Sequence, residues 1–324
     1  MPCHPHRILK RQIFFMATSL GSPVVQVPEE QTNHFLDLLV CPSSATKDRW
    51  QSNSSLNPHG HEEGSPAHFV TFDAQNQIQD TIYVLGGTDS VGGVDAVVNA
   101  VDKITNPVPG AIFDTSPLDL HTAREHLNSV IGADGALFVI GGEDDANAYG
   151  CVERYDPPEV FGTSAGTSWF LQAGQQHARV YHSVAGLLDD GRIFSAGGVD
   201  NPHSIEVYSP RYMFRGQRPV VSGMSATTWS YNQSTNGPTF SVAFRPGITF
   251  QRMHLIKSCS VTHGFDESQR FVSLRLGVGI TGSNPYTVTV ETPKDRWVAP
   301  RGDYMLFVVG SDGVPSVGTW THLQ

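Results

Sequence analysis

An adjacent tyrosine and histidine, Tyr181 and His182, are the residues of this chain whose types most readily suggest chemistry. A phenol and an imidazole placed together can serve as ligands of a metal ion. Successive side chains of a β-strand point to opposite faces, so both rings can reach one ion only at a bend, a bulge or a strand end. The flanking residues Val180 and Ser183 do not indicate such a bend. The residue types alone therefore favour ordinary packing over a metal site.

Other histidines also have the residue type of a metal ligand. The stretch 59–63, HGHEE, combines two histidines with two glutamates, but it lies in a polar, turn-rich segment and is interpreted as a solvated loop. His121 and His126 flank Arg124, and we expect them to form hydrogen bonds at the edge of a sheet. These histidines are therefore weaker candidates than the Tyr-His pair.

The Tyr-His pair lies at the mouth of a predicted β-hairpin. The stretch 179–198 reads RVYHSVAGLLDDGRIFSAGG, with apolar runs on both sides of an Asp-Asp-Gly turn and a glycine pair at the end. Two earlier stretches follow the same plan and end at the glycine pairs 86–87 and 141–142. The three pairs recur every 55 or 56 residues. This period predicts a repeat of hairpin-based units.

Such a repeat is typical of kelch-type β-propeller blades. Aromatic strands follow the second and third glycine pairs, as VERYDP at 152–157 and IEVYSP at 205–210. A blade is a four-stranded sheet that needs neighbours on both faces, and a closed ring normally has at least four blades. We count about three, so residues 64–211 are predicted to form an incomplete propeller.

Beyond Pro210 the glycine pairs stop and short alternating strands follow, separated by turn residues. Residues 212–324 therefore predict an immunoglobulin-like β-sandwich, with the apolar strand YMLFVVG at 304–310 in its core. The fold class expected for the chain is all-β. An incomplete kelch-type propeller would be followed by the sandwich.

Composition excludes several classes of partner. The formal net charge is −10, and no Lys/Arg-rich run occurs beyond residues 6–11, so no nucleic-acid partner is expected. No apolar stretch has the length of a membrane span, so no membrane partner is expected either. A hydrophobic fraction of 39% is enough for a sizeable core.

Residues 1–63 show no clear periodicity and predict an irregular segment. A short basic stretch followed by IFFMATSLGS resembles a weak signal peptide. Asn53 and Asn232 each begin an N-glycosylation sequon, which would suit a secreted chain. We therefore expect a secreted, extracellular protein.

Three passages together resemble the galactose oxidase and glyoxal oxidase family of copper radical oxidases. The stretch 179–198 resembles the family's Tyr-His copper motif in the last propeller blade. SVTHGFDESQRFVSL, at 260–274, resembles a C-terminal Thr-His-x5-Gln-Arg loop that supplies a further histidine ligand. The residues 299–323 resemble the closing strands of the family's early-set domain. The resemblance covers roughly residues 64–324 and rests on the combination of motifs.

The resemblance implies a copper ion held by Tyr181, His182 and His263. It implies a reaction in which a primary alcohol, an aldehyde or a carbohydrate substrate is oxidised with O2 to give H2O2. Copper takes one electron and a tyrosyl radical the other. Tyr181 would be the axial ligand and the catalytic base that takes the alcohol proton.

One half of the family's site has no counterpart here. Family members carry a second tyrosine, thioether-bonded to a cysteine in an early blade, as ligand and radical site. No tyrosine precedes Tyr83, and Cys41 lies in a segment that does not align. His126 falls at an equivalent point of a blade, which we interpret as similarity between repeats. The expected function is therefore an impaired copper oxidase, with a non-catalytic remnant or a truncated gene model as the alternative.

Overall fold

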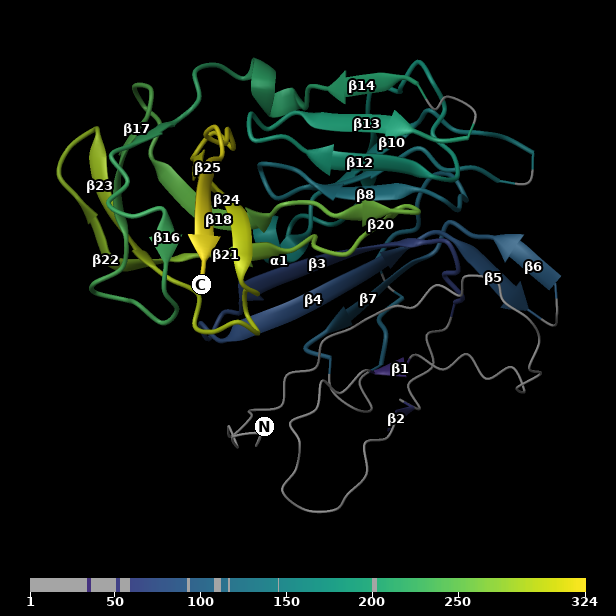
Figure 1. Cartoon of the computed structure of the whole chain (residues 1–324), viewed down its shortest axis with the longest axis horizontal. Helices are drawn as coiled ribbons and strands as arrows, with labels where there is room; N and C mark the ends of the chain where they lie inside the picture. Colours follow the sequence, from purple (N-terminus) through teal and green to yellow (C-terminus); the bar gives the residue numbers. More distant parts are fainter. Residues whose placement is uncertain are drawn as a thin grey trace, which may run out of the picture.

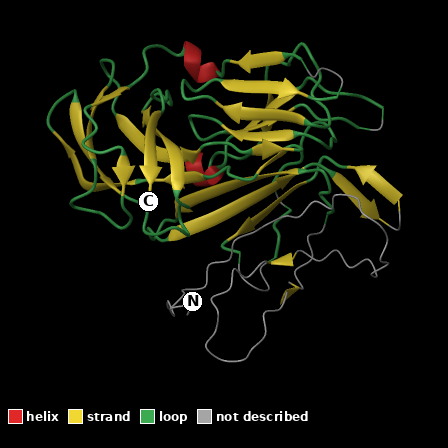
Figure 2. Cartoon of the chain, viewed as in Figure 1, coloured by secondary structure: helices red, strands yellow, loops and turns green. Residues whose placement is uncertain are grey.

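The computed structural model describes residues 34–35, 51–52, 59–91, 94–107, 112–115, 117–144, 146–199 and 203–324. In these residues almost all of the regular secondary structure is β-strand, joined by loops and turns (Figure 2). The exceptions are a single helical turn, α1 (Pro158–Phe161), and a 3-10 turn, η1 (Arg211–Phe214). Nothing helical in the described ranges has the length and apolar character needed to cross a membrane. The predicted all-β class is confirmed.

Three antiparallel sheets stand where the glycine-pair repeat predicts them (Figure 1). The first contains β3 (Ser65–Phe72), β4 (Ile78–Leu85) and β7 (Val101–Thr105). The second contains β8 (Asn128–Ile131), β9 (Leu137–Ile140), β10 (Val152–Tyr155) and β11 (Trp169–Leu171). The third contains β12 (Ser183–Leu187), β13 (Ile193–Gly197) and β14 (Ile205–Tyr208). That these sheets are blades of a kelch-type propeller stays a prediction.

The glycine pairs end the second strand of each sheet because the chain there approaches its neighbour closely. Gly141 has a φ of 68°, and a Cβ atom at this position would lie 2.6 Å from the carbonyl oxygen of Arg179. The amide of Gly142 donates a hydrogen bond to that same carbonyl at 2.7 Å. A side chain at the first glycine would therefore push the third sheet away from the second.

The C-terminal stretch folds into a sandwich, as predicted. One layer has the order β15-β17-β23-β22, and the strands are β15 (Val220–Ser222), β17 (Thr239–Ala243), β22 (Arg275–Thr281) and β23 (Tyr286–Glu291). The facing layer contains β16 (Thr228–Trp229), β18 (Phe250–Lys257), β21 (Phe271–Ser273), β24 (Gly302–Gly310) and β25 (Thr319–Leu323). Trp229, Phe240, Leu255 and Leu306 fill the space between the layers. The predicted core strand is confirmed, since every residue from Tyr304 to Gly310 is buried.

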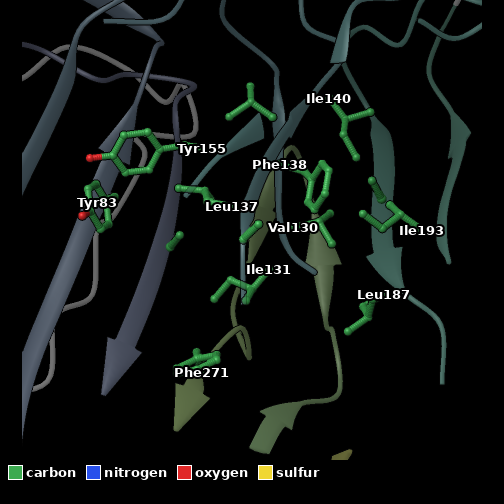
Figure 3. Packing of buried hydrophobic residues seen from close by; sticks show 14 of the residues in the cluster. Tyr83, Val130, Ile131, Leu137, Phe138, Ile140, Tyr155, Leu187, Ile193 and Phe271 are labelled. Atoms are coloured by element: carbon green, nitrogen blue, oxygen red, sulfur yellow. The ribbon is translucent and has the colours of Figure 1, made fainter. Parts of the chain in front are cut away.

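The first sheet and the sandwich share strands. β21 pairs in parallel with β3, through Phe271 and Phe69, so that β3, β4 and β7 extend the sandwich layer into one eight-stranded sheet. A single hydrophobic cluster runs from this sheet through the other two, with Tyr83, Phe138, Leu187 and Phe271 among its members (Figure 3). A division of the chain at residue 211 stays a prediction.

Candidate metal centre

The chain bends at His182. This residue has a φ of 65°, in the left-handed region that few residues other than glycine adopt, and it immediately precedes β12. The bend turns the imidazole to the same side as the preceding phenol. The rings of Tyr181 and His182 stack with centroids 3.9 Å apart and an angle of 29° between their planes. The geometric obstacle expected for neighbours on one strand is thus removed.

His263 lies beside Tyr181 and His182, although it comes from a later part of the chain. It lies in the turn between β19 (Val261–Thr262) and β20 (Phe265–Asp266). His263 and Gly264 have φ values of 53° and 75°, as the two central residues of a type I′ hairpin require. The His263 ring centroid lies 4.6 Å from that of His182 and 5.5 Å from that of Tyr181. The structure therefore brings all three predicted ligand residues together.

The hairpin is positioned by close backbone packing at Gly264. A Cβ atom on Gly264 would lie 2.5 Å from the carbonyl oxygen of Leu127, the residue before β8. The Gly264 carbonyl accepts a hydrogen bond from the Ser65 hydroxyl at 2.7 Å, and that serine begins β3. The hairpin is therefore held against the first two sheets at its tip.

Gln269 fixes the other end of the same segment. Its Oε1 atom accepts a hydrogen bond from the Ile131 amide at 2.6 Å. Its Nε2 atom donates to the carbonyl oxygens of Ser129, at 3.2 Å, and Pro66, at 3.3 Å. Arg270 faces the sandwich, where its Nη1 atom donates to the carbonyl oxygen of Trp297 at 2.8 Å. The Gln-Arg pair of the motif thus joins the sheets to the sandwich.

His126 is a further ring in this cluster that sequence reasoning did not place there. Its ring centroid lies 4.8 Å from that of Tyr181, and it has a φ of 54° like the other two histidines. Its Nδ1 atom lies 2.9 Å from Glu143 Oε1, so the predicted hydrogen-bonding role is confirmed. Glu143 Oε1 also accepts a hydrogen bond from the Tyr181 amide at 3.1 Å. His126 lies shortly before β8 as His182 lies before β12, and this similarity was the sequence signal that could have placed His126 in the cluster.

The cluster is open to solvent and has carboxylates on one side. His182 is exposed, whereas Tyr181 and His263 are half-buried. The Nδ1 atom of His263 contacts the Thr262 hydroxyl at 2.7 Å, which leaves Nε2 as its free nitrogen. Glu63 Oε2 lies 3.7 Å from His126 Nε2. Two imidazoles and a phenol are a donor set that suits copper(II), so the residues present fit this ion.

The stretch 59–63 differs from the solvated loop expected for it. His61 is only 6% exposed, and its Nε2 atom lies 3.0 Å from a carboxylate oxygen of Asp102. The segment is a loop as expected, but it is not solvated at His61, because that ring contacts the Gly86 carbonyl oxygen and the carboxylate of Asp102. The hydrogen bond expected for His121 is confirmed, with its Nδ1 atom 2.7 Å from Glu153 Oε2.

Comparisons with known proteins support the resemblance read from the motifs. Residues 218–323 match the galactose oxidase-like early set domain. The chain is 29% identical over 277 residues to a galactose oxidase of Gibberella zeae, covering 83% of this chain and 38% of that protein. It is 30% identical over 159 residues to an aldehyde oxidase, GLOX, of Vitis pseudoreticulata, covering 45% of this chain and 30% of that protein.

A solved structure has the same fold over most of the chain. A fungal alcohol oxidase described as a complex with copper superposes with a TM-score of 0.68 at 23% identity, over 85% of this chain and 57% of that one. The predicted similarity to galactose and glyoxal oxidases is therefore confirmed. The chain spans less than two thirds of the length of each of these relatives.

Proposed function

We propose that this chain carries the Tyr-His-His part of a copper centre. The centre would oxidise a primary alcohol, an aldehyde or a carbohydrate with O2, giving the aldehyde or acid and H2O2. The observation that carries the proposal is the convergence of Tyr181, His182 and His263, whose ring centroids lie 3.9–5.5 Å apart although His263 comes from a separate part of the sequence. The similarity to a galactose oxidase and to an aldehyde oxidase supports this choice of chemistry.

In the proposed site His182 and His263 provide imidazole ligands. Copper, when bound, supplies a one-electron redox partner and a charge that lowers the pKa of a nearby phenol. Tyr181 would then hold the proton taken from the substrate hydroxyl. For a primary alcohol the balance is RCH2OH + O2 → RCHO + H2O2. The exposed position of His182 gives substrate and O2 access from solvent.

The second electron of this oxidation needs a one-electron store besides copper. Within the described residues, Tyr181 is the only tyrosine whose ring contacts the histidine cluster, and the place beside it is taken by His126. We therefore propose an impaired oxidase, and the alternative is a copper-binding remnant without turnover. The two readings share the metal site and differ only in the reaction.

Copper binding tests the site by itself. Copper(II) added to the purified full chain is expected to bind with a stoichiometry of one, measured by calorimetry, and to give an electron paramagnetic resonance signal with nitrogen hyperfine structure. His263→Ala and Tyr181→Phe should each weaken binding by about tenfold or more. His121→Ala is the matched control, because its imidazole contacts Glu153 outside the cluster. Unchanged affinity in the first two variants would overturn the ligand assignment.

Peroxide release tests the reaction. The copper-loaded chain is mixed with a panel of primary alcohols, aldehydes and sugars, and H2O2 is measured with a coupled peroxidase. Release that depends on both substrate and His263 supports the oxidase. No release from a chain shown to hold copper would rule out the oxidase and leave the remnant.

We also propose that the chain acts outside the cell. Asn232, which begins one of the two sequons, is exposed in the structure and so is accessible to a glycosylating enzyme. Expression in a secreting eukaryotic host should then give a chain whose mass falls on treatment with a glycosidase. An unmodified Asn232 in material from the medium would count against this use of the sequon.

A further inference from the structure

A buried arginine side chain recurs at one position in the second and third sheets. In each sheet an arginine joins the carbonyl oxygen of the first glycine of the pair to a carboxylate on the following strand. Arg124 donates from Nη1 to the Gly141 carbonyl oxygen at 2.9 Å and from Nη2 to Glu153. Arg179 donates from Nη1 to the Gly197 carbonyl oxygen at 3.0 Å, and its Nη2 atom lies 3.3 Å from Glu206 Oε2. A guanidinium keeps its charge at every accessible pH, so the buried Glu153 and the half-buried Glu206 are permanently compensated.

In the first sheet a histidine takes the place of this arginine. His61 Nδ1 lies 2.6 Å from the carbonyl oxygen of Gly86, and His61 Nε2 lies 3.0 Å from Asp102 Oδ2. A carbonyl oxygen only accepts hydrogen bonds, so Nδ1 carries the hydrogen. In a neutral ring, Nε2 then presents a lone pair to a carboxylate. Two hydrogen-bond acceptors, His61 Nε2 and Asp102 Oδ2, can lie this close only if a proton or a metal ion is bound between them.

A second imidazole reaches the same carboxylate. His59 Nδ1 lies 3.2 Å from both oxygens of Asp102. The Asp102 side chain is fully buried, whereas the His59 side chain is 37% exposed, so the group has one opening to solvent. The three donor atoms lie within 4.8 Å of one another. Among the histidines, cysteines, aspartates and glutamates that the structure describes, this is the only such three-residue group.

We propose that His59, His61 and Asp102 form a binding site for a divalent transition-metal ion of the Zn2+ type. Tetrahedral ligands at about 2.0–2.2 Å from zinc stand roughly 3.3–3.6 Å apart. The two imidazole nitrogens lie 3.2 and 3.0 Å from the Asp102 oxygens, and all three donor atoms lie within 4.8 Å of one another. The Gly86 carbonyl fixes the His61 tautomer that leaves Nε2 free to bind, as the outer partners of metal-ligating histidines do. The site is separate from the Tyr181 cluster and does not depend on its function.

The identity of the residues favours an ion over a structural proton. Replacing arginine by histidine removes a permanent charge from the first sheet and introduces a lone pair that a metal can use. A divalent ion would restore the missing positive charge beside Asp102, which is 0% exposed and has no guanidinium contact of this kind among the residues that the structure describes. Two histidines and one carboxylate leave a fourth position for water, facing the exposed edge of His59.

The test uses the full chain carrying His263→Ala, so that the other cluster binds the probe more weakly and its share of the signal is reduced. Zn2+ is titrated by calorimetry, and Co2+ absorption provides a spectroscopic readout of the ligand geometry. We expect one bound ion and a melting temperature that rises with Zn2+ concentration. His59→Ala removes a half-exposed ligand with little risk to folding and should weaken binding by about 10-fold to 100-fold or more.

His61→Arg is the decisive variant because it restores the arginine of the neighbouring sheets. It should keep the fold, judged by an unchanged melting temperature without metal, and abolish Zn2+ binding. His121→Ala removes the equivalent imidazole beside Arg124 and should leave Zn2+ affinity unchanged. Absence of Zn2+ binding at millimolar concentration, or Zn2+ affinity in His59→Ala and His61→Arg equal to that of the His263→Ala parent, overturns the proposal and leaves His61 a structural, hydrogen-bonding role.

Discussion

Three histidines adopt a backbone conformation that is costly for any residue with a Cβ atom. His126, His182 and His263 have φ values of 54°, 65° and 53°, and their rings all contact Tyr181. Left-handed conformations of non-glycine residues cost about 1–3 kcal/mol and persist where the surroundings impose them, commonly at functional sites. The cost at these positions is consistent with selection for where the imidazoles point.

Because of this cost, two substitutions of His182 should differ in stability although both weaken copper binding. His182→Gly and His182→Ala both delete an exposed imidazole, but only alanine keeps the Cβ atom that strains the backbone. We expect the glycine variant to be more stable than the alanine variant by about 1 kcal/mol, measured by urea unfolding. Both should lose copper affinity. Equal stability of the two variants would show that the bend carries no strain.

Glu143 is expected to act as a positioning residue for the cluster. One of its oxygens accepts hydrogen bonds from the Tyr181 amide at 3.1 Å and contacts His126 Nδ1 at 2.9 Å. Glu143→Ala should reduce copper affinity by about tenfold and alter the paramagnetic spectrum. Glu143→Gln keeps an acceptor at this point and should recover most of the affinity. If both variants bind copper like the wild type, Glu143 does not position Tyr181.

At the scale of the element, the β19–β20 hairpin depends on a glycine for two separate reasons. Gly264 has a φ of 75°, and a Cβ atom there would also lie 2.5 Å from the Leu127 carbonyl oxygen. Gly264→Ala should therefore destabilise the chain by more than the conformational cost alone, which is about 1–2 kcal/mol, and should displace His263 and weaken copper binding. Unfolding in urea and copper calorimetry measure the two effects.

Gly247 provides the matched control for that prediction. Its φ is 80°, and a Cβ atom at Gly247 would meet nothing within 4 Å. Gly247→Ala should therefore show the conformational cost and no loss of copper affinity. If the two alanine variants behave alike, the contact with Leu127 does not position the hairpin.

The strands were predictable from sequence because their signals are local. Alternating apolar residues and the spacing of the glycine pairs predicted the three sheets and the sandwich core. The bend at His182 was not predictable, since a positive φ at a histidine leaves no trace in its neighbours. The burial of His61 was missed because it depends on Asp102, 41 residues further along the chain. Metal ligation by Tyr181, His182 and His263 stays a prediction.

At the scale of the whole molecule, the ends of two hairpins hold the sheets against the sandwich. At the β8–β9 turn, His254 Nε2 lies 3.1 Å from the Ala133 carbonyl oxygen, and Arg252 Nη2 donates to the Asp134 carbonyl oxygen at 2.6 Å. At the β12–β13 turn, the Gly318 amide donates to the Asp189 carbonyl oxygen at 2.7 Å. The Asp-Gly turns that mark the repeat therefore contact the sandwich.

The buried imidazole at this junction predicts how stability depends on pH. Burial, together with the nearby positive charge of Arg252, lowers the pKa of His254 to about 3. The ring stacks on Phe271 with centroids 4.5 Å apart, and its Nδ1 atom is buried without a hydrogen-bond partner. Below a pH of about 6.5 the unfolded chain binds a proton that the folded chain rejects. This group therefore contributes full stability above pH 6.5 and loses it as the pH falls toward 3.

His254→Gln removes the titration while its amide nitrogen can still donate to the Ala133 carbonyl. Between pH 6.5 and 4.5 the wild type should lose roughly 2 kcal/mol more unfolding free energy than the variant, because one proton contributes about 1.4 kcal/mol per pH unit. Urea unfolding of both proteins at several pH values in this window measures the difference. Parallel pH profiles would mean that the imidazole at the junction takes up its proton without unfolding. The contact between the hairpin end and the sandwich would then have to tolerate a charge.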